Sequence, residues 1–315
     1  MKRLVAMMIS FILLFSIVGC TVNEKPLRIG TWKTAQTIQP FFYENYLNNK
    51  EIEVLPFTNP GDMKMALLSS SLDICGSTLV TAITARAKGE PIVVLAGLSN
   101  GCSALVIKKD SGIREIKDLK GKKIAYVPGT MHHLLLLEVL GKAGLSPEKD
   151  VELIRVDFFD MGQALKRGDI DAFYSGEPYP SMAVIEGYGE ILLYPNEETG
   201  FGTINSVMIT TKERIEEKPE LIKNLVYAHY MSTIRLNNDN EAWVNKSLEF
   251  GVERDVLKLS MENINLFWDI DKDYIKRVEK LSLRMKEQGM IEEVPDIEAM
   301  FFTRYVEDIR EDYEK

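Results

Sequence analysis

Histidine and cysteine are scarce in this chain, with three residues of each among 315. No close pair of cysteines is followed by spaced histidines, so the sequence predicts no structural zinc site. His132 and His133 are neighbours on an expected helix and point in different directions, which disfavours a shared metal. The chain also lacks a nucleophile elbow, a phosphate-binding loop and a spaced histidine–cysteine pair. We therefore expect no catalytic residues, no metal and no cofactor.

Positive charge is also limited. The chain has 38 basic and 47 acidic residues, a net charge of −9, and removal of residues 1–19 with their two basic side chains would leave −11. Such a surface has little attraction for nucleic acid or anionic lipid. No apolar run after the first twenty residues is long enough to cross a membrane. The remaining chain is long enough for two domains or lobes.

The first residues predict export. Lys2 and Arg3 precede an uncharged, mostly apolar run from Leu4 to Val18, which is typical of a signal peptide and short for a membrane span. We expect a signal peptide at 1–19 and a short polar tether at 20–26.

The end of this run, Ile17-Val18-Gly19-Cys20, resembles the lipoprotein box of bacteria, which implies lipidation of Cys20 and attachment to the outer face of the cell membrane. The alternative is an ordinary cysteine that closes a signal sequence. Cys75 and Cys102 would then be either a disulfide or two buried free thiols, and we favour the thiols.

Apolar runs alternate with helical patterns from Pro26 onward, which predicts an α/β fold with mostly parallel sheets. We expect strands at Leu27–Gly30, Ile52–Pro56, Leu72–Cys75, Ile92–Leu98, Lys123–Val127, Val151–Val156, Asp169–Tyr174 and Glu190–Tyr194. Helices are expected at Thr37–Asn48, Pro60–Ser70 and Thr78–Lys88. Only helices are expected after Glu213, at Glu220–Asn237, Glu241–Phe250, Asp255–Phe267 and Asp273–Gln288.

A shift of the chain by 98 positions superimposes the two series of strands, so that Asp73 meets Asp171 and Ser77 meets Ser175. This predicts two lobes of one topology. Ala104–Lys108 is expected to lead out of the first lobe and Thr203–Thr211 to lead back, forming a two-crossing hinge over a ligand cleft. The expected bounds are 27–105 with 206–315 for the first lobe and 106–205 for the second.

Several short segments together resemble the nitrate, sulfonate, taurine and thiamine-precursor group of periplasmic-type solute-binding proteins. They are Ile29-Gly30-Thr31-Trp32, Leu72-Asp73-Ile74-Cys75-Gly76, Asp118-Leu119-Lys120-Gly121-Lys122-Lys123-Ile124, Gly168-Asp169-Ile170-Asp171-Ala172 and Gly176-Glu177-Pro178. The resemblance covers about residues 27–283. It implies a type II periplasmic-binding-protein fold, a solute bound between the lobes, and delivery to a membrane permease that is driven by an ATPase.

Candidate binding residues follow from the carboxyl ends of the strands, where ligands settle in α/β sheets. The candidates are Trp32, Lys33, Ser77, Thr78, Asn100, Gly129, Thr130, His132, Asp157, Glu177, Tyr179 and Asn205.

Each candidate with a chemical rationale also has a structural alternative. Ser77-Thr78 and Gly129-Thr130 open helices and would offer donors to an oxyanion or carboxylate, or simply cap those helices. Glu177 would repel an anion and suits an amino group, unless it is a hinge-side residue that holds Lys33 or a backbone group. Trp32 and Tyr179 would stack on a flat ring or pack in the core.

One of the two adjacent histidines, His132 or His133, is expected to face the cleft. Asn205 would either contact the solute or satisfy the hinge backbone. The mixed set of hydroxyls, amides, one acid and two aromatic rings slightly favours a nitrogen heterocycle such as an aminopyrimidine over a sulfonate, taurine or nitrate.

The sequence therefore predicts an exported, monomeric solute-binding lipoprotein of an ATP-driven importer. A resemblance of the fold to thiamine-pyrimidine synthases and menaquinone-pathway enzymes keeps an enzyme as the alternative, although their chemistry belongs in the cytoplasm. A binding module that presents solute to a sensor is a third reading, and no fused signalling segment supports it.

Overall fold

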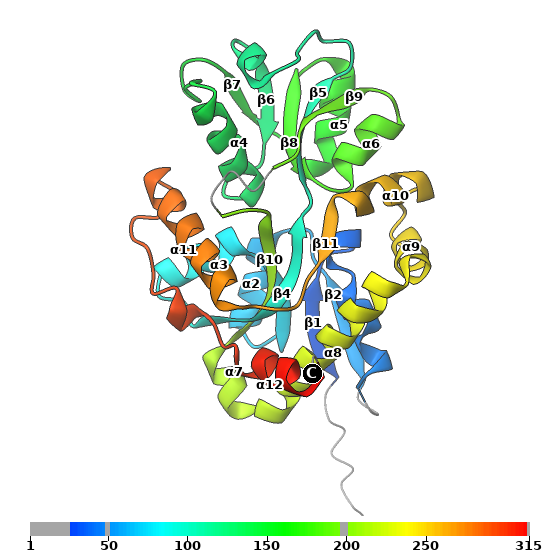
Figure 1. Ribbon diagram of the computed structural model, residues 1–315, viewed down its shortest axis with the longest axis vertical. Helices are drawn as coiled ribbons and strands as arrows, with labels where there is room; N and C mark the ends of the chain where they lie inside the picture. Colours follow the sequence, from blue (N-terminus) through cyan, green and yellow to red (C-terminus); the bar gives the residue numbers. More distant parts are fainter. Residues whose placement is uncertain (1–25, 48–50, 196–200, 314–315) are drawn as a thin grey trace, which may run out of the picture.

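The computed structural model describes residues 26–47, 51–195 and 201–313. Two β-sheets flanked by helices lie one above the other, and each forms the centre of one lobe (Figure 1). The expected signal peptide at 1–19, Cys20 and all of the tether except Pro26 lie outside the described residues.

The first lobe contains a six-stranded sheet in the order β11-β4-β10-β3-β1-β2. Its strands are β1 (Leu27–Thr31), β2 (Ile52–Pro56), β3 (Ile74–Thr78), β4 (Ile92–Gly101), β10 (Ile204–Thr211) and β11 (Ile264–Leu266). The second lobe contains a five-stranded sheet in the order β7-β6-β8-β5-β9. Its strands are β5 (Ser103–Lys108), β6 (Lys123–Tyr126), β7 (Glu152–Arg155), β8 (Ala172–Gly176) and β9 (Gly189–Leu193).

The two sheets confirm the predicted repeat. A shift of 98 residues moves β3 onto β8, and the order β2-β1-β3-β10-β4 corresponds strand by strand to β7-β6-β8-β5-β9. The prediction of mostly parallel sheets is wrong, because both are mixed: β10 pairs antiparallel with β3 and β4, and β5 pairs antiparallel with β8 and β9. β10 and β5 are each the first strand after a crossing from the other lobe, and the edge strand β11 of the first lobe is also antiparallel to its neighbour β4.

The crossings are shorter than the sequence suggested. Ala104–Lys108 lies within β5 and Thr203–Thr211 is almost entirely β10, so both are sheet strands rather than connections. The outward crossing is confined to 101–103, three residues before the expected boundary after 105. The return crossing falls between the end of β9 at Leu193 and the start of β10 at Ile204.

Helices fill the connections and the last third of the chain. Those that connect strands are α2 (Pro60–Leu68), α3 (Leu79–Ala87), α4 (Met131–Lys142), α5 (Phe158–Arg167) and α6 (Tyr179–Ile185). The later helices are α7 (Lys212–Glu217), α8 (Pro219–Asn238), α9 (Asn240–Leu248), α10 (Arg254–Glu262), α11 (Lys272–Glu287) and α12 (Arg304–Tyr313). Short 3₁₀ segments are η1 (Ala35–Thr37), η2 (Gln39–Asn45), η3 (Ile116–Leu119) and η5 (Glu298–Met300). Within the described ranges, none of the helices combines the length and the apolar character that a membrane span requires.

Two helix predictions were wrong. In the predicted helix Thr37–Asn48, whose last residue lies outside the described ranges, Gln39–Asn45 form the 3₁₀ segment η2 and Thr37 ends η1. The hydroxyl of Thr37 donates to the carbonyl of Trp32 at 2.9 Å, a local bond that competes with helical pairing. The predicted helix Asp255–Phe267 ends at Glu262, and β11 follows at the edge of the first sheet. Ile264 and Leu266 are buried while Asn265 is exposed, which is the alternation of an edge strand.

Cys75 lies in β3 and Cys102 in the outward crossing, and both are buried free thiols. The free-thiol alternative is thus confirmed. Burial raises the pKa of the Cys75 thiol far above its ordinary value and that of Cys102 to about 12. Since only the thiolate is nucleophilic, both should be inert in the folded protein.

We therefore expect chain that begins after Cys20 to react with a thiol reagent such as 5,5′-dithiobis(2-nitrobenzoate) only after denaturation. Absorbance at neutral pH should show two equivalents in guanidinium and almost none without it. Rapid reaction of either thiol in the folded protein would contradict the described burial.

Candidate functional site

The carboxyl ends of the parallel strands in the two lobes face each other. In the second lobe Ser103, the last residue of the outward crossing and the first of β5, pairs with Gly176 at the carboxyl end of β8. In the first lobe Ser206, close to the return crossing, pairs with Thr78 at the carboxyl end of β3. Each parallel set therefore ends at the crossings, on the side of the other lobe. We call these two facing borders the interlobe edges.

Four rings form a row along the interlobe edge of the second lobe. Phe158 stacks on Tyr179 with ring centroids 6.3 Å apart and planes 11° from parallel, and it meets the ring of His132 edge-on at 5.4 Å. Phe159 meets Tyr179 edge-on at 5.8 Å. Because these residues open α4, α5 and α6, three connections contribute to one aromatic surface. Its outer member, Phe159, is 66% exposed.

Trp32 provides an aromatic surface on the interlobe edge of the first lobe. Its half-buried ring lies over Gly76, where a Cβ would be only 3.0 Å from Cζ3 of the indole. Ser77 is buried, and its hydroxyl donates to the carbonyl of Thr78 at 3.1 Å. The hydroxyl of Thr78 accepts the backbone N–H of Thr81, so it caps α3. The capping alternative therefore accounts for the Thr78 hydroxyl.

Thr130 caps α4 in the same way. Its hydroxyl accepts the N–H of His133 at 3.2 Å and donates to the carbonyl of Val127 at 2.8 Å. Gly129, directly before it, is exposed and has a left-handed φ of 71°. The backbone N–H of Gly129 donates to Nδ1 of His133 at 3.4 Å, so the N–H of Gly129 and the hydroxyl of Thr130 are both already used.

Glu177 is part of the hinge. Its carboxylate is 3% exposed and accepts hydrogen bonds from Ser260 Oγ at 3.1 Å, Asn263 Nδ2 at 3.2 Å and the backbone N–H of Ser181 at 3.2 Å. Burial raises the pKa of this carboxyl, and the three donors lower it in part. Ser260 and Asn263 come from α10 and its carboxyl end, so Glu177 joins the two lobes. The N–H of Ser181 is the backbone group that the hinge alternative expects, whereas Ser260 and Asn263 take the place expected for Lys33.

The backbone of the outward crossing is held from several sides. Asn205 is 5% exposed and donates through Nδ2 to the carbonyl of Gly101 at 2.9 Å. Gly101 N–H donates to the carbonyl of Thr203, and Cys102 N–H donates to that of Asn263, both at 2.7 Å. The amide of Asn205 therefore satisfies the hinge backbone. Of the other candidates, Lys33 and Asp157 are exposed at the interlobe edges.

Side-chain amides are a feature that sequence reasoning largely missed. The side-chain oxygens of Gln36, Gln39 and Asn100 are buried and have no hydrogen-bond partner within the described ranges. Gln39 Nε2 donates to the carbonyl of Leu98 at 2.7 Å, which places this amide beside the end of β4 and hence near Asn100. Buried acceptors without donors are costly, so a bound molecule or water with N–H or O–H groups would stabilise them. Asn100 was predicted from its place after a strand, and the glutamines gave no comparable signal.

The lobes also contact each other through later helices. In Figure 1, α6 lies above α10 on one side of the crossings, and α4 lies above α11 on the other. On the α4 side Arg284 Nη2 of α11 is 2.7 Å from Oε1 of Glu138, a carboxylate that is 4% exposed. These contacts hold the lobes in the arrangement seen here.

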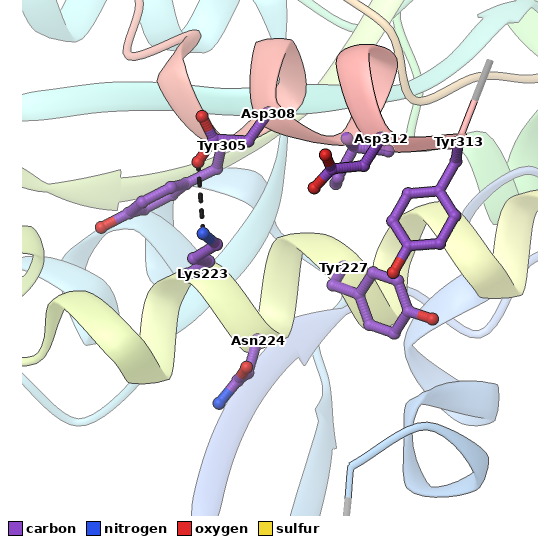
Figure 2. Close-up of a pocket in the computed structure, with 8 residues that line it drawn as sticks. Lys223, Asn224, Tyr227, Tyr305, Asp308, Asp312 and Tyr313 are labelled. Atoms are coloured by element: carbon purple, nitrogen blue, oxygen red, sulfur yellow. Dashed lines mark ion pairs between the residues drawn. The ribbon is translucent and has the colours of Figure 1, made fainter. Parts of the chain in front are cut away.

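A pocket of about 240 Å³ lies elsewhere, between α8 and α12 of the first lobe. Figure 2 shows Tyr227 and Tyr313 at one end of it and Lys223 at the other, where its ammonium is 3.3 Å from Asp308. None of the predicted residues lines this pocket, and both of its helices belong to one lobe. In the described part of the chain, no cluster of three or more His, Cys, Asp or Glu side chains has the geometry to hold a metal.

Comparison with known proteins identifies sequence relatives of this chain. A binding protein of Brucella abortus is 30% identical over 236 residues, which cover 72% of each chain. The 4-amino-5-hydroxymethyl-2-methylpyrimidine phosphate synthase of Schizosaccharomyces pombe is 33% identical over 122 residues, which are 38% of this chain and only 34% of that enzyme.

Solved structures agree with the expected type II periplasmic-binding-protein fold. The periplasmic aliphatic sulphonate-binding protein SsuA of Escherichia coli superposes with a TM-score of 0.77 at 20% identity, covering 89% of this chain and 93% of SsuA. The periplasmic nitrate-binding protein NrtA of Synechocystis superposes with a TM-score of 0.73 at 18% identity, covering 93% and 90%. A family model described as NMT1/THI5 like matches residues 42–241. The chain therefore belongs to the NMT1/THI5-like family.

Proposed function

We propose that this chain is the extracytoplasmic solute-binding protein of an ATP-driven importer, and that it captures a small organic or oxyanion solute between the interlobe edges. The observation that carries the proposal is the pairing of two opposed surfaces: Trp32 on one lobe, and the row of Phe158, Phe159, Tyr179 and His132 on the other. A solute that touches both lobes favours their closed arrangement, because only differential affinity shifts such an equilibrium.

Both kinds of relative support this reading. SsuA and NrtA are binding proteins for sulphonate and nitrate, and the Brucella relative is a binding protein. We further propose that residues 1–19 direct export, that lipid on Cys20 anchors the chain, and that a monomer delivers its solute to a permease with an ATPase. An enzyme on this fold is the second candidate, which the match to the yeast phosphate synthase favours.

A thermal-shift screen of chain that begins after Cys20 tests the proposal. The panel should contain ethanesulfonate, taurine, nitrate, bicarbonate and 4-amino-5-hydroxymethyl-2-methylpyrimidine. A true solute at 100 times its Kd stabilises the fold by about 2.7 kcal/mol, or about 5 to 10 °C in Tm. The compound should be recovered unchanged by mass spectrometry. Chemical conversion would favour the enzyme, and the absence of any shift across this and a wider panel would count against solute binding.

Trp32→Ala should weaken the binding of that compound about tenfold or more, because it removes one aromatic surface. Tyr313→Ala is the control for loss of an accessible aromatic ring: Tyr313 is exposed and lies in the pocket of α8 and α12, away from the interlobe edges (Figure 2). Isothermal titration should give an unchanged Kd for the control. Equal Kd values for both variants would remove Trp32 from the site.

A further inference from the structure

The ring of His132 is tightly packed at the hinge end of the second lobe. Its side chain is 8% exposed, and Nδ1 is 2.9 Å from Oγ of Ser103. A Cβ on Gly176 would be 2.8 Å from Nε2, so the absence of a side chain at 176 makes room for the imidazole. Phe158 covers the ring edge-on at 5.4 Å.

The hydroxyl of Ser103 decides the tautomer. Ser103 is fully buried, and His132 Nδ1 is the one partner that its Oγ has in the described part of the chain. A hydroxyl has one proton to donate, and a buried donor without an acceptor is costly. Ser103 therefore donates to Nδ1. The imidazole proton then resides on Nε2, for which the described residues provide no hydrogen-bond acceptor. Nε2 is not one of the fully buried atoms that lack a partner, so it keeps some access to solvent.

The position of Ser103 is itself fixed by the crossing. Its backbone pairs with Gly176, and its carbonyl accepts Asn263 Nδ2 at 3.3 Å. The ring that it holds is the buried end of the aromatic row, beside Phe158 and on the interlobe edge. Nε2–H is thus an oriented donor that finds no acceptor among the described residues, next to the surface on which we place the solute.

We propose that Ser103 is a positioning residue that fixes the orientation and tautomer of His132, so that Nε2–H donates a hydrogen bond to an acceptor oxygen or ring nitrogen of the solute. This inference rests on the proposed function and deepens it: His132 becomes a specificity-determining residue that selects for an acceptor atom through a neutral imidazole. Burial supports this by lowering the pKa of His132 to about 4, which keeps the ring uncharged at neutral pH.

The positioning step is testable without solute. Nitrogen-15 NMR of histidine-labelled protein at pH 7 should show His132 with a protonated Nε2 and an unprotonated Nδ1. Ser103→Ala should give a mixture of tautomers, and Ser103→Thr, which restores the hydroxyl, should return the wild-type pattern. A protonated Nδ1 in the wild type, or an unchanged pattern in Ser103→Ala, would overturn the proposal.

The solute contact is tested with whichever panel compound gives the largest thermal shift. His132→Leu should raise its Kd about three- to tenfold, the worth of one neutral hydrogen bond. His132→Gln, whose amide nitrogen can replace Nε2, should lose less, and His133→Gln is the matched control on the next residue. Binding with an unchanged Kd in His132→Leu would overturn this inference alone, whereas no binding by any compound would remove the proposed function and this inference together.

Discussion

The free energy of unfolding should fall by about 4 kcal/mol between pH 7.5 and pH 5, because two buried imidazoles must stay neutral in the fold. Burial lowers the pKa of both His132 and His229 from 6.5 to about 4. His229 accepts the hydroxyl of Tyr43 on Nδ1 at 2.7 Å and donates through Nε2 to the carbonyl of Gly97 at 2.6 Å.

The sign follows from which state binds the proton. A histidine of the unfolded chain takes up its proton as the pH falls through about 6.5, whereas the folded state resists until about 4. The stability from each neutral imidazole is therefore fully present above 6.5 and is lost progressively down to 4. Burial raises the pKa of Glu177 and opposes this trend in part.

Urea denaturation between pH 4.5 and 7.5 would measure the slope. His229→Gln and His132→Gln should each remove about half of it, while His133→Gln should change it less, since His133 is only partly buried. A free energy of unfolding that stays constant between pH 5 and 6.5 in the wild type would contradict the neutral burial of these rings.

Gly101→Ala should destabilise the protein by about 3 kcal/mol or more, because the outward crossing has neither the backbone conformation nor the space for a side chain. Gly101 has a left-handed φ of 73°, and a Cβ would be 2.6 Å from the backbone oxygen of Asn263. That oxygen accepts the N–H of Cys102 at 2.7 Å, so moving it would break a hinge hydrogen bond.

Gly89→Ala provides the matched control. Gly89 has a similar φ of 77°, but a Cβ there would meet nothing within 4 Å. It should therefore lose only the left-handed backbone preference, about 1 kcal/mol. Thermal and urea denaturation of the two variants would separate the cost of the left-handed backbone, which both share, from the cost of the steric clash at position 101. Equal losses would show that the crossing can yield to a side chain, and small-angle scattering would then report whether the lobes had moved.

Much of the fold could be predicted because its signals are local. The bounds of β2 follow from a short, mostly apolar run that ends at Pro56. The shift of 98 residues predicted that β3 and β8 are equivalent strands. What failed depends on distant partners. β11 is a strand because Ile264 pairs with Gly101, across more than 160 residues, and nothing near Ile264 announces that neighbour.

The candidate site divides in the same way. Trp32, Tyr179 and His132 were predicted as binding residues from their places after strands. The structure puts all three on the interlobe edges, and their contact with a solute stays a prediction. Glu177 lies in the predicted region but is occupied by Ser260 and Asn263, which no spacing connects to it. The hydroxyl of Thr130 is likewise consumed by its own helix. The sequence was sufficient to place these residues at the interlobe edges. Which of them are used by the hinge, and which are left to meet a solute, could be decided only from the hydrogen bonds in the structure.

The placement of β10 between β3 and β4 also imposes an order on folding. All strands of the second sheet lie between Ser103 and Leu193, so this lobe can complete its sheet from one contiguous segment. In the first sheet, β3 and β4 are joined only through β10 (Ile204–Thr211), which is synthesised roughly a hundred residues after β4. Until then β3 carries an unpaired edge, the kind of surface on which chains aggregate. We therefore expect the inserted lobe to complete its sheet first, and the insertion of β10 between β3 and β4 to complete the sheet of the first lobe.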